Sequence, residues 1–120
     1  MIQPVIISTS NELFRVLPNR IVYISSDGNY STMILHDNTK HLFTFNLSHF
    51  QKLLENQLGE QASIFIRIGK SVIINREYLF RINIGKQQLV LSDISLNESF
   101  VLTASREALK QLKSLIEKEI

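Results

Sequence analysis

The amino-acid sequence predicts a mainly β fold, built from antiparallel strands with two short helices. Three observations lead to this prediction. Ten short runs of β-type residues are separated by turn signals. Only two stretches place apolar residues at helical spacing, and no helix alternates with the strands as parallel βαβ units require.

The predicted strands come in two series of five. The first series occupies residues 5–8, 12–17, 20–25, 30–36 and 41–45. Asp27 and Gly28 stand between its third and fourth members, and an Asp-Gly pair supplies the positive φ of a tight turn. The second series occupies residues 64–68, 72–74, 79–84, 87–91 and 99–103.

The two helical stretches separate and follow these series. Residues 48–58 form the first, with Ser48 as its cap, and it stops before Gly59. Residues 106–119 form the second, capped by Thr103 or Ser105. We interpret the apolar stripe of each as core packing, which is the commoner use of such a stripe.

The composition restricts the class of protein. A chain of 120 residues without linkers or repeats predicts one domain over residues 1–120. The absence of cysteine excludes disulfides, thiolate metal sites and cysteine nucleophiles. No run of about 18 apolar residues and no secretory signal follows Met1, so we expect a cytoplasmic protein without a membrane span.

The charge is unevenly distributed. The formal net charge is only +2, but residues 61–90 hold five basic side chains and the single acid Glu77. A focused basic surface suits a polyanion, although many soluble domains simply solvate such a cluster.

Motifs for catalysis are absent from the sequence. It contains no nucleophile elbow, phosphate-binding glycine loop or His-Glu-x-x-His pattern. The spacing of His36, His41 and His49 matches no metal-ligand pattern, so we expect no enzyme activity, metal or cofactor. A small hydrolase or metal-dependent enzyme remains the hypothesis that metal analysis would test.

The most distinctive stretch is residues 65–75, where two β-type runs surround Gly69, Lys70 and Ser71. Glycine permits close approach of another chain, and the other two residues offer a cation and a hydroxyl to phosphate or base edges. The stretch lacks the upstream glycine and following helix of a Walker motif, so nucleotide hydrolysis is disfavoured.

This stretch resembles the signature of LytTR DNA-binding domains, Phe-x-Arg-x-His-Arg/Lys-Ser-x-x-Val/Ile-Asn. Residues 21–30 resemble the family's early Ile-x-Tyr-Ile-x-Ala-x-Gly-Asn-Tyr segment, and Ser105-Arg106 resembles its late Ser-Arg. The three motifs occur in order, and the match spans about residues 12–118. We therefore identify the chain as similar to these bacterial transcription regulators.

The resemblance implies a fold and a site. It implies an elongated stack of small antiparallel β-sheets whose loops reach major grooves of double-stranded DNA. The family's contacting positions fall on Asn29, Tyr30, Gly69, Lys70 and Arg106. Lys70 and Arg106 suit guanine or phosphate, whereas Asn29 suits a base edge or phosphate and Tyr30 the sugar.

Three of these positions also have a structural interpretation. Asn29 fits a positive-φ turn, Tyr30 fits a buried site, and Arg106 fits an ion pair with an acid of the last helix. Gly69 replaces the family's usual histidine, which implies altered sequence preference or weaker binding.

The predicted function is sequence-specific DNA binding and transcription regulation, with a homodimer on repeated half-sites. Too few residues precede the matched region for a receiver domain, so we expect a stand-alone member controlled by a signalling partner in trans. The alternative is a LytTR-like protein-interaction module that modulates a sensor or regulator with weak or no DNA binding. The operator, target genes, sign of regulation and controlling signal are not encoded in any pattern we recognise.

Overall fold

A computed structural model describes residues 3–120. Met1 and Ile2, the first residues of the segment in which we expect no secretory signal, lie outside the described residues. Each of the predicted strands and helices is present, with boundaries that differ by one or two residues in most cases. The strands are β1 Val5–Ser8, β2 Leu13–Val16, β3 Ile21–Ser26, β4 Ser31–Leu35, β5 Lys40–Phe43, β6 Phe65–Ile68, β7 Val72–Asn75, β8 Leu79–Asn83, β9 Gln88–Leu91 and β10 Phe100–Thr103. The helices are α1 Leu47–Leu58 and α2 Arg106–Glu117, and the short 3-10 turns are η1 Pro18–Arg20, η2 Gly59–Ile64 and η3 Arg76–Tyr78.

The strands form three antiparallel sheets, as predicted. A hairpin pairs β1 with β2, a three-stranded sheet has the order β10-β9-β8, and a five-stranded sheet has the order β5-β4-β3-β7-β6. The larger sheet brings β7 beside β3, which lies far earlier in the chain. Pairing between distant strands of this kind leaves no local pattern in the sequence.

The five-stranded sheet has a hydrophobic cluster on each side. Ile24 and Ile73 belong to one cluster together with Phe50 of α1. Tyr23 and Ile74, their neighbours along β3 and β7, pack in the other cluster together with Leu109 of α2. Because successive side chains of a strand point to opposite faces, β3 and β7 supply both clusters.

The two α-helices are capped by polar side chains. Asn46, not Ser48, caps α1, since its Oδ1 accepts a hydrogen bond of 2.9 Å from the His49 amide. Ser48, the predicted cap, is the second residue of the helix. Ser105 caps α2 as one of the two predicted alternatives, accepting 3.1 Å from the Ala108 amide.

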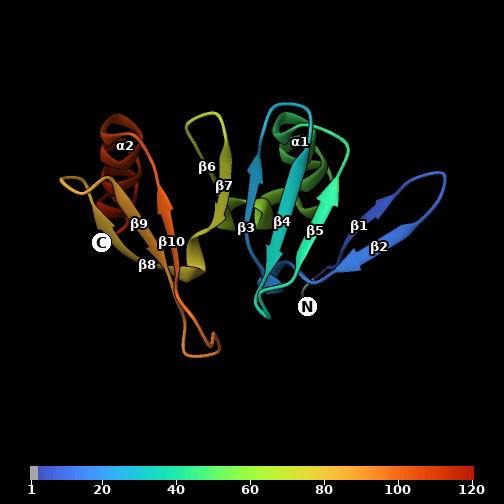
Figure 1. Ribbon diagram of the computed structural model, residues 1–120, viewed down its shortest axis with the longest axis horizontal. Helices are drawn as coiled ribbons and strands as arrows, with labels where there is room; N and C mark the ends of the chain where they lie inside the picture. The colour runs from blue at the N-terminus through green and yellow to red at the C-terminus, as the bar shows by residue number, and fades with distance from the viewer. Residues whose placement is uncertain (1–2) are drawn as a thin grey trace.

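The molecule is elongated, with extents of 44 × 33 × 28 Å. Figure 1 shows α2 and its three-stranded sheet at one end and the β1–β2 hairpin at the other. The connections that follow β3, β6 and β10 all reach the same long edge, which is the upper one in this view. None of the helices described within residues 3–120 is long and apolar enough to cross a membrane.

Candidate nucleic-acid interface

The β3–β4 connection places Asn29 and Tyr30 at the long edge. The amide of Asp27 donates to the Tyr30 carbonyl at 3.2 Å, which closes the turn. Gly28, with a φ of 93°, occupies the left-handed position, so the turn does not need Asn29 there. Tyr30 is 49% exposed, so it is not a buried residue. Both side chains are therefore free of the structural roles that the sequence left open for them.

The β6–β7 turn presents Gly69, Lys70 and Ser71, and all three are exposed. Gly69 has a φ of 59°, a backbone conformation that glycine adopts without steric cost. A Cβ at this position would meet no atom within 4 Å, so only the backbone conformation selects glycine. The turn thus leaves open space beside Lys70.

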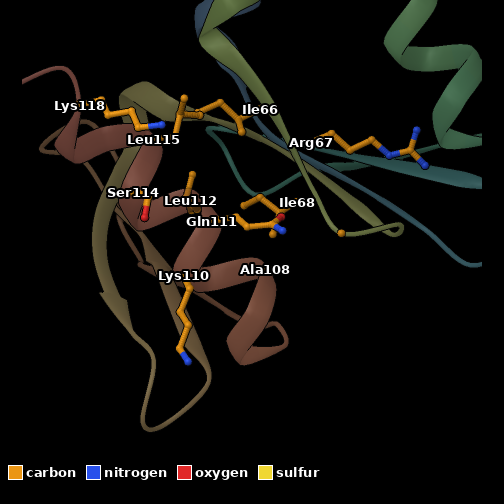
Figure 2. A pocket seen from close by; sticks show the side chains of 11 residues that line it. Ile66, Arg67, Ile68, Ala108, Lys110, Gln111, Leu112, Ser114, Leu115 and Lys118 are labelled. Atoms are coloured by element: carbon orange, nitrogen blue, oxygen red, sulfur yellow. The ribbon is translucent and has the colours of Figure 1, made fainter.

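Arg67 fixes this turn to α1. Its Nη1 donates to Ser48 Oγ at 2.9 Å and to Gln51 Oε1 at 3.1 Å, and its Nη2 donates to the Lys70 carbonyl at 3.1 Å. Figure 2 shows the guanidinium directed away from α2. The planar fork of arginine matches several acceptors at once, and the position of the Lys70 backbone therefore depends on α1.

The β3–β4 and β6–β7 connections are also joined to each other. The Ser26 amide donates to the Ser71 carbonyl at 2.8 Å. The fully buried Ser31 donates from Oγ to the Phe45 carbonyl at 2.7 Å, which fixes the start of β4 to the segment before α1. These bonds hold the two turns and the beginning of α1 in one arrangement.

Two hollows mark this part of the edge. One of about 360 Å³ lies between the two turns and is bordered by Gly28, Ser48 and Lys70. A second of about 500 Å³ is bordered by Asn29, His49 and Lys52. The amino end of a helix carries a partial positive charge, so the first turn of α1 adds to the positive character of this surface.

Sequence reasoning did not identify Ser48, His49 and Lys52 as candidate DNA contacts, because the apolar stripe of α1 was interpreted only as core packing. They are exposed residues in the first two turns of α1. The available signal was a lysine close to the amino end of a predicted helix. No local sequence pattern shows that this helix lies beside Asn29.

Arg106 lies in the second part of the edge, at the first position of α2. Its Nη2 donates to the Gly85 carbonyl in the β8–β9 turn at 3.3 Å. Within the part of the chain that the structure describes, this contact replaces the expected ion pair with an acid of the last helix. It also brings the exposed Lys86 near Arg106, a second candidate that sequence reasoning missed.

The predicted site residues therefore form two groups. Asn29, Tyr30, Gly69 and Lys70 lie on turns that are hydrogen-bonded to each other. Arg106 lies with the three-stranded sheet, and it shares only the long edge with them (Figure 1).

The side chains of His36 and His41 have partners other than a metal ion. His36 Nδ1 accepts from Arg20 Nε at 3.4 Å, and His41 Nε2 lies 3.0 Å from Thr39 Oγ1. The Thr39 hydroxyl and amide both donate to Asp37, and these bonds hold the pKa of that carboxyl below its usual value. Residues 3–120 contain no group of three His, Asp or Glu side chains arranged to hold a metal.

A known protein family and a solved structure resemble this chain over most of its length. The model of the family described as LytTr DNA-binding domain matches residues 11–117. Among solved structures, the chain is similar to the LytTr DNA-binding domain of a protein described as a methyl-accepting/DNA response regulator from Bacillus cereus. The TM-score is 0.65 and the identity 17%, over 94% of this chain and 95% of that one. None of the curated proteins matches.

Proposed function

Since this chain belongs to the LytTr DNA-binding domain family, we propose that it is a sequence-specific transcriptional regulator that binds duplex DNA through one edge. The observation that supports this most directly is the common edge reached by the connections after β3, β6 and β10 (Figure 1). Loops on one edge of a rigid scaffold can enter successive grooves of a single duplex, and exposed basic side chains on them supply the attraction to phosphate.

The two basic residues take different roles in this proposal. Arg106 reads a guanine, because its guanidinium can donate two parallel hydrogen bonds to O6 and N7. Lys70 is a compact point charge and neutralises a phosphate. Asn29 bonds a base edge or phosphate, Tyr30 lies against sugar, and Gly69 lets the backbone approach the DNA closely.

The remaining features of the proposal concern where the protein acts, how it assembles and what controls it. The chain functions in the cytoplasm as one domain over residues 1–120, without catalysis. Two molecules bind repeated half-sites, and an upstream signalling protein in trans controls them. Two observations favour a protein-interaction module instead: Gly69 stands where the family usually has histidine, and the net charge is only +2.

A salt titration separates these two functions. A preferred duplex would first be selected from a random DNA pool, and its affinity would then be measured against a scrambled duplex at several salt concentrations. A DNA reader loses affinity steeply with salt, because phosphate contacts release counterions. Binding that is absent or insensitive to salt would leave the protein-interaction function in its place.

Alanine variants test the residue roles. We expect Arg106→Ala to cost about 1–3 kcal/mol on the preferred duplex and to relax discrimination at one position. Lys70→Ala should weaken both duplexes similarly and lower the salt slope by about one unit. Lys40→Ala is the matched control, because this exposed lysine lies in the β4–β5 region on the opposite edge. Unchanged binding by both folded site variants would refute the proposed contact surface.

A further inference from the structure

A groove of about 510 Å³ runs between β6 and α2 (Figure 2). Its apolar lining comes from Ile66 and Ile68 of β6 and from Leu112 and Leu115 of α2. Leu115 is 41% exposed although it belongs to the apolar stripe of the helix. Ile68 and Leu112 are buried, so the accessible apolar surface of the groove is that of Leu115 and of the half-buried Ile66.

One wall of the groove is the free edge of β6. This strand is the last in the five-stranded sheet, and within residues 3–120 it pairs with β7 alone. An edge strand presents unpaired N–H and C=O groups that can pair with another extended chain. Arg67 does not obstruct this edge, because its guanidinium is bound to Ser48, Gln51 and the Lys70 carbonyl.

The other wall carries two cations. Lys110 of α2 and Lys118, which directly follows the helix, border the groove, and no Asp or Glu is among its lining residues. They are eight positions apart, which corresponds to about 12 Å along a helix axis. A strand advances about 3.3 Å per residue, so the same distance spans about four strand residues. Lys113 differs from both, because it lies outside the groove lining and its Nζ is 3.0 Å from Glu117.

We propose that this groove binds an extended acidic segment of a protein partner, which adds a strand to the edge of β6. Backbone hydrogen bonds to β6 provide affinity, as in other cases of strand addition. Two carboxylates four positions apart meet Lys110 and Lys118, and an apolar side chain midway between them points the same way and covers Leu115 and Ile66. The apolar lining favours a protein over nucleic acid, because a protein segment can place an apolar side chain between its two carboxylates and a phosphate backbone cannot.

The probe is the fluorescein-labelled peptide Ser-Glu-Val-Leu-Val-Glu-Ser, titrated into the full chain without DNA and followed by anisotropy. We expect saturable binding that weakens with salt. Lys110→Glu and Lys118→Glu should each weaken it about three- to tenfold, because an attraction is replaced by a repulsion. Lys113→Glu makes the same change in charge outside the groove and should leave the affinity within about twofold.

Two further measurements decide where and how the peptide binds. Amide hydrogen exchange should slow in β6 when the peptide is added, and Leu115→Asp should weaken binding while the protein keeps its melting temperature. A peptide that does not bind, or that binds all three lysine variants alike, would overturn the proposal. Slowed exchange of β6 amides by duplex DNA instead of the peptide would overturn it too, and would assign the groove to nucleic acid. The peptide titrations contain no DNA, so failure of the DNA-binding function would not affect their result.

Discussion

The β6–β7 turn and the start of α2 both present an exposed basic residue at the same edge, but the fold holds them in different ways. Lys70 sits on a turn that is fixed by the Arg67 guanidinium and by the bond between Ser26 and Ser71. Arg106 has one long hydrogen bond, to the Gly85 carbonyl, and otherwise depends on how α2 packs on its sheet. A polar network therefore positions one candidate contact, and apolar packing positions the other.

The largest effect that tests this comparison is expected from the apolar side. Leu109 is fully buried in the cluster beneath α2, and Leu109→Ala should lower the free energy of unfolding by about 2–5 kcal/mol. Urea unfolding measures the loss. Hydrogen exchange should quicken mainly in α2, near Arg106, while the β6–β7 turn keeps its protection.

Leu54→Ala is the counterpart on the α1 side, since Leu54 is 2% exposed in the other cluster. Its loss of stability should be similar, with faster exchange in α1. If both variants quicken exchange equally on both sides of the central sheet, the two sides unfold as one unit and the comparison fails.

A smaller effect is expected from the polar network. Arg67→Gln removes three hydrogen bonds from a partly exposed guanidinium, and it should cost about 1–2 kcal/mol of stability. DNA affinity should fall while the salt slope stays unchanged, because Lys70 still meets a phosphate. Arg81→Gln, which removes an exposed charge from the same basic stretch, serves as control. A drop of one unit in the salt slope for Arg67→Gln would show that Arg67 contacts DNA directly.

The smallest effect concerns the backbone of the β6–β7 turn. Gly69→Ala should lower stability by about 1 kcal/mol, because alanine adopts a φ of 59° only with strain. Gly85→Ala is a matched control, since its Cβ would meet Asn83 Oδ1 at an ordinary 3.6 Å. Thermal melting of the two variants side by side measures the difference, and equal melting temperatures would mean that Gly69 is dispensable to the turn.

Local patterns predicted most of the secondary structure. Alternation and turn residues placed every strand, and Ser105 was among the predicted caps of α2 because capping depends on residues three apart. The cap of α1 was misplaced by two positions, since Asn and Ser are both common capping residues. Which of Asn46 and Ser48 caps the helix depends on where the backbone changes from extended to helical, and that is at Asn46.

The arrangement of the site was less accessible from sequence. The five predicted contact positions came from the family resemblance, whereas the contacts of Arg67 with Ser48 and Gln51 depend on where α1 packs. Lys52 and Lys86 join the edge for the same reason, through helix and turn placements that no short pattern encodes.

The pairing of β3 with β7 has a consequence for how the chain acquires its structure. Tyr23 lies opposite Ile74, so this contact closes a loop of about 50 residues. During synthesis, β3 can pair with β4 at once, but its second edge stays bare until β7 has left the ribosome. Closing so long a loop costs entropy that only the later burial of both hydrophobic clusters recovers, which makes the β3–β7 junction the natural slow step of folding.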